Sequence, residues 1–110
     1  MTELLKKKCV PCEGGLPKLE GPVLQMMLQE VSGWELRGDR IHKDFRFKHF
    51  LQAMDFVNAM ARLAEDEGHH PDFCVHYREV AVTIWTHAIG GLSENDFILA
   101  AKIDALPPPK

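Results

Sequence analysis

The sequence predicts a single α+β domain of two layers, in which a four-stranded antiparallel sheet carries its helices on one face. Three observations lead to this prediction. The chain has 110 residues, enough for one hydrophobic core but not for two. Apolar residues recur at helical spacing in three stretches and at every second residue in four others. The alternating stretches come in two pairs, so the predicted order is helix, strand, strand, helix, strand, strand, helix.

The first predicted helix covers about residues 19–31, and Pro22 suits its first turn. Two strands follow at about 34–37 and 41–47, because apolar and polar residues alternate in both stretches. Gly38-Asp39 lies between them and is typical of a two-residue hairpin turn. The first part of the sheet is therefore expected to be an antiparallel hairpin.

The second predicted helix covers about residues 48–67 and ends at Gly68, because glycine readily adopts the left-handed conformation that closes a helix. Pro71 prevents the helix from resuming. One apolar stripe is expected along this helix, formed by Phe50, Met54, Val57, Ala61 and Ala64. His69 and His70 therefore follow directly after a helix C-terminus.

A second pair of strands is predicted at about 73–77 and 80–87. The turn between them is placed around Arg78-Glu79, although it contains neither glycine nor asparagine. One face of such a sheet stays bare, and the long helix is rich in apolar residues. An oligomer is therefore expected, because these surfaces need cover.

Ser93 is expected to cap the last helix, which extends to about Leu106. Asp96 stands three residues later, where its carboxylate can accept a hydrogen bond from the Ser93 backbone N–H in a capping box. Leu92 and Phe97 have the spacing of a hydrophobic staple across the same helix start.

Residues 1–18 are expected to be an irregular lead-in, residues 19–106 the folded domain and residues 107–110 a proline-rich tail. The formal net charge is −3, and no basic face suggests nucleic-acid binding. No stretch has the ~18–20 apolar residues that cross a bilayer, and Met1 to Val10 lacks the apolar core of a signal peptide. A cytoplasmic protein is therefore expected.

Three cysteines stand at positions 9, 12 and 74. The segment Cys9-Val10-Pro11-Cys12 has the spacing of a zinc knuckle or a redox pair. A structural zinc site usually draws on a second pair, which the sequence lacks, and a redox pair normally opens a helix after a strand. We therefore expect neither metal binding nor redox chemistry from this segment.

The residues with the greatest capacity for chemistry gather near the ends of predicted elements. His69 and His70 follow a helix and His87 ends a predicted strand. Histidine exchanges protons near neutral pH, and a helix C-terminus favours its charged form. Glu65 and Asp96 are carboxylates that could orient an imidazole, although an acidic helix end and a helix cap explain them equally well. From spacing alone, zinc binding by the three histidines is as arguable as acid–base catalysis.

A longer pattern narrows these alternatives. It consists of Glu65, three positions, His69-His70-Pro71, five positions, Tyr77, nine positions, His87, eight positions and Asp96. In this spacing the sequence resembles the pterin-4a-carbinolamine dehydratase family. Gly-Trp at 33–34, Phe-x-Phe at 45–47 and Gly-Leu-Ser at 91–93 add to the resemblance, which runs from about residue 19 to 106.

The resemblance implies a reaction and a set of roles. The substrate would be a 4a-hydroxytetrahydropterin, which loses water to give quinonoid dihydropterin in tetrahydrobiopterin recycling, with no metal or organic cofactor. His69 and His87 would be the principal acid–base pair. His70 would position the substrate and support proton transfer, and Glu65 and Asp96 would orient the imidazoles. The implied pterin-binding residues are Trp34, His69, His70, Pro71, Thr86, His87, Ala88 and Ile89.

The resemblance also implies a homotetramer, or a dimer, formed through helix packing. Vertebrate members of the family resemble a dimerisation cofactor for a transcription factor, so a scaffold that binds a partner helix is an alternative function. A pterin-binding protein of another pathway is a second alternative. The presence of all three histidines favours the enzyme.

Overall fold

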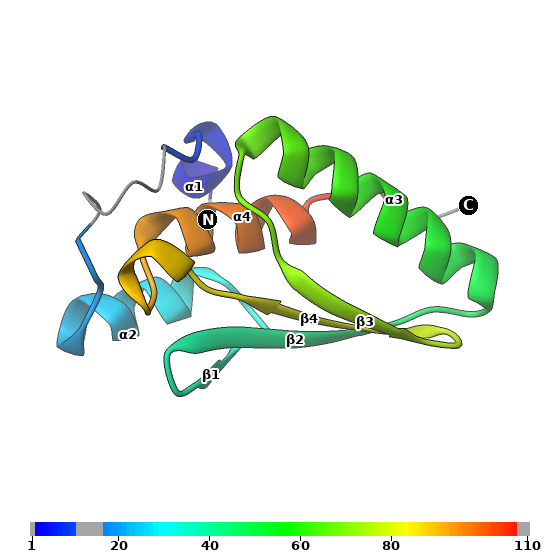
Figure 1. The fold of residues 1–110 in the computed structure, drawn as a ribbon, viewed down its shortest axis with the longest axis horizontal. Helices are drawn as coiled ribbons and strands as arrows, with labels where there is room; N and C mark the ends of the chain where they lie inside the picture. The colour runs from blue at the N-terminus through cyan, green and yellow to red at the C-terminus, as the bar shows by residue number, and fades with distance from the viewer. Residues whose placement is uncertain (1, 11–16, 108–110) are drawn as a thin grey trace.

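Four antiparallel strands form one sheet in the order β1-β2-β4-β3, with the helices on one of its faces (Figure 1). The computed structural model describes residues 2–10 and 17–107. The strands are β1 (Glu35–Arg37), β2 (Arg40–Arg46), β3 (Asp72–His76) and β4 (Glu79–Ile84). The helices are α1 (Thr2–Lys6), α2 (Gly21–Glu30), α3 (Phe50–Glu67), the 3₁₀ helix η1 (His87–Ile89) and α4 (Glu94–Asp104). The predicted α+β fold class is confirmed.

The two hairpins differ in how well they were predicted. Gly38 has a φ of +62° between β1 and β2, as a glycine-led turn requires. The second turn lies one residue earlier than predicted, because Tyr77 adopts a φ of +57° and begins it. The prediction that the last strand reaches residue 87 was also wrong. β4 ends at Ile84, which is the last residue that pairs with β2, and His87 begins η1.

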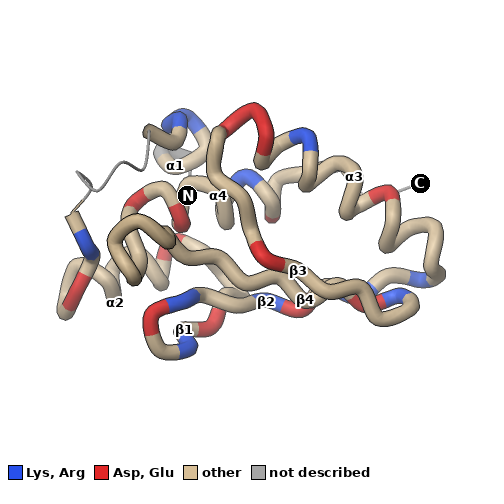
Figure 2. Tube along the Cα trace, viewed as in Figure 1, with Lys and Arg blue, Asp and Glu red and all other residues tan. Residues whose placement is uncertain are grey.

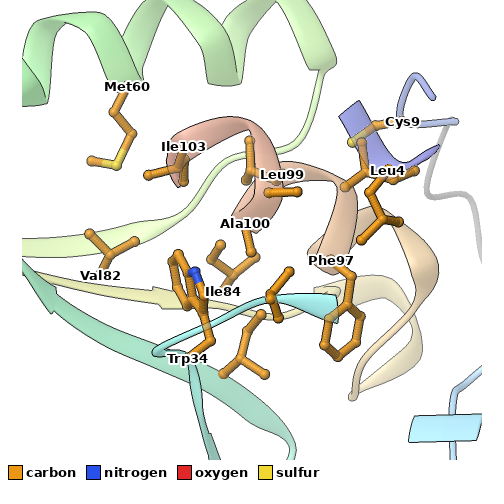
Figure 3. Packing of buried hydrophobic residues seen from close by; sticks show 14 of the residues in the cluster. Leu4, Cys9, Trp34, Met60, Val82, Ile84, Phe97, Leu99, Ala100 and Ile103 are labelled. Atoms are coloured by element: carbon orange, nitrogen blue, oxygen red, sulfur yellow. The ribbon is translucent and has the colours of Figure 1, made fainter. Parts of the chain in front are cut away.

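The core lies between the sheet and α4. Eight of the eleven residues of α4 are buried, so this helix is enclosed on most of its circumference. From the sheet, four inward-facing side chains of β2 and β4 are fully buried: Ile41, Val80, Val82 and Ile84. Figure 3 shows Phe97, Leu99 and Ile103 of α4 in one packed cluster with Val82 and Ile84 of β4. This packing fixes the N-terminus of α4 relative to the end of β4.

The buried stripe of α3 differs from the predicted one. Its members are Ala53, Phe56, Val57, Met60 and Ala64. Phe50 is 46% exposed, and Met54 and Ala61 are not buried either. The helix is rotated toward Phe56 because this ring packs against two aromatic rings of the sheet layer, with centroid distances of 4.6 Å to Phe45 and 5.1 Å to Phe47.

The beginning of the chain is not wholly irregular, which corrects the prediction for residues 1–18. Thr2–Lys6 form α1, and Leu4 and Cys9 are buried in the core. Lysines of this segment run beside the acidic C-terminal end of α3 (Figure 2), where Lys8 Nζ donates a hydrogen bond to the Asp66 carbonyl at 2.9 Å. The other half of the Cys9-Val10-Pro11-Cys12 pattern lies outside the described residues.

Residues 8–10 form a connection that we call the N-terminal strap. The Cys9 N–H donates to Glu67 Oε1 at 2.8 Å, at the last residue of α3. Val10 and Asn95 exchange two hydrogen bonds, of 3.0 Å from the Val10 N–H to Oδ1 and 2.7 Å from Nδ2 to the Val10 carbonyl. The strap therefore joins the end of α3 to the first turn of α4.

Glu67 is the charged centre of this connection. Its Oε2 accepts a hydrogen bond from Lys102 Nζ at 2.7 Å, and both side chains are largely buried. Burial acts to raise the pKa of Glu67, but the Cys9 N–H, Lys102 and Lys8 outweigh it and hold the pKa below its ordinary value of 4.5. The carboxylate therefore stabilises the fold above its unfolded-state pKa and loses this effect as the pH falls through the folded-state pKa.

Glu67→Gln is expected to lower the free energy of unfolding by about 1–2 kcal/mol at pH 7, because one charge-assisted hydrogen bond is lost. The difference from the native protein should shrink as the pH falls below about 4.5. Urea unfolding at pH 7 and at pH 3 measures both quantities. Asp66→Asn, which changes the exposed neighbouring carboxylate, is the matched control and should have little effect. A Glu67→Gln difference that stayed constant with pH would contradict this account.

Candidate active site

His69 is held by a buried carboxylate from a distant part of the chain. Gly68 ends α3 with a φ of +66°, and the chain turns so that His69 points toward the start of α4. There His69 Nε2 lies 2.6 Å from Asp96 Oδ1, with side-chain exposures of 6% and 0%. An ionised carboxylate only accepts hydrogen bonds, so the geometry fits donation from the Nε2–H. The ring of His69 is thus fixed in one orientation.

Asp96 is fixed in turn by its position in the first turn of α4. Ser93 and Asp96 form the predicted capping box, and the Ser93 N–H donates to Asp96 Oδ2 at 2.8 Å. The Thr86 hydroxyl donates to the same oxygen at 2.8 Å. A helix N-terminus also favours a negative charge. The same carboxylate therefore caps α4 and contacts the His69 imidazole.

His70 has a carboxylate partner of a different kind. Its Nε2 lies 2.7 Å from Glu65 Oε1, one turn back on α3. Both side chains are exposed, at 59% and 79%, so the pair contributes little to stability. The contact nevertheless limits where the His70 ring can point.

His87 reaches the same place from the other half of the chain. The backbone beyond β4 is tied by a bridge between Thr86 and Gly91, and η1 begins at His87. The imidazole is exposed, and its centre lies 4.0 Å from that of the Trp85 ring, with the planes tilted by 38°. Within the described part of the chain, His87 makes no hydrogen bond or ion pair through its side chain.

The turn after α3 and the segment from the end of β4 into η1 line an open cavity of about 380 Å³. It is lined by Gly68, His69, His70, Pro71, Asp72, Trp85, Thr86, His87 and Ala88. The His-His-Pro turn thus forms one side, and the segment from the end of β4 into η1 forms the other. The structure brings together all three predicted catalytic histidines in one place.

Two residues expected near a pterin lie elsewhere. Trp34 is packed in the core (Figure 3), where its Nε1–H donates to Asp104 Oδ2 at 2.9 Å, and it does not line the cavity. Ile89 does not line it either. Trp85 and Asp72 line the cavity instead, and the sequence did not identify either as a site residue. Both directly adjoin motif residues, because Trp85 precedes Thr86-His87 and Asp72 follows the His-His-Pro turn.

Metal ligation was the competing interpretation of the histidines. Among residues 2–10 and 17–107, no three histidine, cysteine, aspartate or glutamate side chains are grouped so that they could hold a metal ion.

In the same ranges, no helix is long and apolar enough to span a membrane.

Comparison with known proteins agrees with this geometry. The family model described as Pterin 4 alpha carbinolamine dehydratase matches residues 17–106. The chain belongs to the pterin-4a-carbinolamine dehydratase family. Its relatives include a protein from Rubrobacter xylanophilus that carries the family name and is 45% identical over 96% of this chain and 100% of its own. The mitochondrial pterin-4-alpha-carbinolamine dehydratase 2 of Arabidopsis thaliana is 47% identical over 96% of this chain and 60% of its own.

Two solved structures have a similar fold. A transcriptional coactivator/pterin dehydratase from Brucella melitensis matches with a TM-score of 0.77 and 33% identity, over 81% of this chain and 97% of that one. A pterin dehydratase-like protein, identified as a RuBisCO assembly factor in the α-carboxysome, matches with a TM-score of 0.56 and 28% identity, over 70% and 89%. The protein is therefore an enzyme of the hydro-lyase class, with pterin carbinolamine dehydratase activity.

Proposed function

We propose that His69, His70 and His87 remove water from a 4a-hydroxytetrahydropterin by general acid–base catalysis, without a metal or organic cofactor. One observation carries the proposal: three histidines from two separate segments line one cavity. The cavity has a volume of about 380 Å³, within the usual range for small-molecule sites. The substrate is a small bicyclic compound, which such a site suits.

The reaction needs one proton donor and one proton acceptor. The acid protonates the 4a oxygen, the C4a–O bond breaks, and water leaves. The base takes the proton from N5, and the N–H electron pair forms the C4a=N5 double bond of the quinonoid dihydropterin. A positioned acid or base typically contributes 10²–10⁴-fold to such a step.

His69 and His87 are assigned as the principal pair, because they come from opposite sides of the cavity. His69 is rigidly oriented by Asp96, while His87 is exposed and accessible to substrate. The two histidines exchange acid and base roles, or act on opposite stereoisomers at C4a. His70 positions the substrate, supported by Glu65. Pro71, Thr86 and Ala88 complete the pterin-binding surface.

The test is an absorbance assay with freshly generated 4a-hydroxytetrahydropterin in the presence of a chelator. The native protein is expected to consume the substrate far faster than the spontaneous reaction, and the chelator should leave the rate unchanged. A folded protein that gave only the spontaneous rate would overturn the proposed function. A rate abolished by the chelator and restored by added zinc would overturn the metal-free mechanism.

We propose that this activity serves tetrahydrobiopterin recycling in the cytoplasm. We also propose that the protein forms a homotetramer. The oligomer is supported by apolar side chains that α3 leaves exposed, Phe50 and Leu51. A second function, binding of a partner protein through this helix, is favoured by the names of the two structural neighbours, a coactivator and an assembly factor. Stoichiometric capture of a helical partner would establish that function beside catalysis.

A further inference from the structure

We propose that Trp85 is the positioning residue of His87, holding the imidazole through ring contact where a carboxylate holds each of the other two histidines. This inference rests on the proposed role of His87 in catalysis. His69 is anchored by Asp96 and His70 by Glu65. For His87, the corresponding contact within the described residues is a tilted ring contact with Trp85, with 4.0 Å between the ring centres and 38° between the planes.

Trp85 is itself held from two neighbouring strands. Its Nε1–H donates to Asp72 Oδ2 at 3.2 Å, at the first residue of β3. The Arg40 guanidinium carbon lies over the indole at 4.1 Å from the ring centre, at the first residue of β2. Extending the pairing of Ile41 with Ile84 by one residue places Arg40 opposite Trp85, so the sheet register creates this contact.

These contacts leave Trp85 little room to bind the pterin directly. The Arg40 guanidinium carbon and the His87 ring centre both lie about 4 Å from the centre of the indole ring, so each covers part of the surface on which a pterin could stack. We therefore expect a pterin in the cavity to contact His87 rather than to stack on the indole. The effect of Trp85 on the reaction therefore passes through His87.

A double-mutant cycle tests this inference. Trp85→Leu is expected to lower kcat by roughly tenfold to a hundredfold with KM nearly unchanged, because a displaced catalytic group reacts poorly. Trp85→Phe keeps an aromatic face and should restore most of kcat. On a His87→Gln background, Trp85→Leu should cost nothing further. An undiminished kcat in Trp85→Leu, or an equal rise of KM on both backgrounds, would overturn the inference, the latter in favour of direct substrate contact.

A measurement that does not depend on activity keeps this test separate from the proposed function. Proton NMR of histidine-labelled protein should show the His87 ring protons shifted upfield by the indole ring current, and Trp85→Leu should remove the shift. If His87→Gln had the native rate, the proposed role of His87 would fail, while the NMR comparison would still decide whether Trp85 orients the ring. Unshifted His87 protons in the native protein would overturn the contact itself.

Discussion

Replacing either His69 or His87 with alanine is expected to reduce kcat of the dehydratase by roughly 10²–10⁴-fold, the usual contribution of a positioned acid or base. If each histidine serves one hydroxyl stereoisomer, each variant should retain activity toward one isomer of the substrate and lose it toward the other. If the two exchange roles, both isomers should be affected in both variants. Stopped-flow absorbance with the separated isomers distinguishes these results.

His76→Ala is the matched control for these variants. His76 ends β3, is exposed and does not line the cavity. Its replacement should leave kcat and KM unchanged. A His69→Ala or His87→Ala protein that kept the native rate on both isomers would contradict the assignment of that histidine. The variants must also retain the native unfolding midpoint, because His69 is buried.

Asp96→Ala is expected to have the largest effect on stability, about 3–5 kcal/mol. The carboxylate is fully buried and accepts three hydrogen bonds, from His69 Nε2, the Ser93 N–H and the Thr86 hydroxyl. Removing it leaves all three donors without their acceptor in a place that water does not reach. Urea denaturation measures the loss, and the kcat of the folded fraction should fall because His69 loses its anchor.

Two further variants separate the roles of Asp96. Ser93→Ala removes the capping hydroxyl but leaves the carboxylate, and should cost only about 1 kcal/mol with kcat nearly native. Asp96→Asn keeps the size and one acceptor oxygen, which cannot serve all three donors at full strength. Asp96→Asn should therefore lose less free energy of unfolding than Asp96→Ala, but its kcat should still be below that of the native protein. An Asp96→Asn protein with native kcat would show that the orienting role is unnecessary.

Features that depend on a few neighbouring residues were predictable from the sequence. Gly68 closes α3 and Gly38 begins the first turn, because each position needs a positive φ that glycine adopts freely. The capping box of Ser93 and Asp96 likewise involves one helical turn. The resemblance to a family then identified the histidines, whose spacing alone could not choose between a metal and proton transfer.

Features that depend on distant partners were not predictable. Alternation continues through Trp85 and Thr86, yet β4 ends at Ile84, the last residue that pairs with β2, and Thr86 pairs instead with Gly91 in an isolated bridge. Turn chemistry disfavours Tyr77 at a positive φ, so the turn was placed one residue too late. Trp34 was expected near the pterin, but its indole N–H bonds to Asp104, 70 positions away in the chain. Such contacts arise only when the layers pack.

The N-terminal strap can open locally beside the site while the sheet stays folded. Detachment of residues 8–10 breaks no strand pairing, so it is a local opening with its own free energy. Cys9, the middle residue of the strap, has a buried thiol 3.6 Å from the Asn95 carbonyl oxygen, whereas Cys74 is exposed. A thiol reagent should therefore label Cys74 at once and Cys9 only as fast as the strap opens. Peptide mass spectrometry over time would measure the rate at which Cys9 is labelled, and so the rate at which the ends of α3 and α4 beside His69 and Asp96 become exposed. Equal labelling rates for Cys9 and Cys74 would show that the strap does not protect the Cys9 thiol.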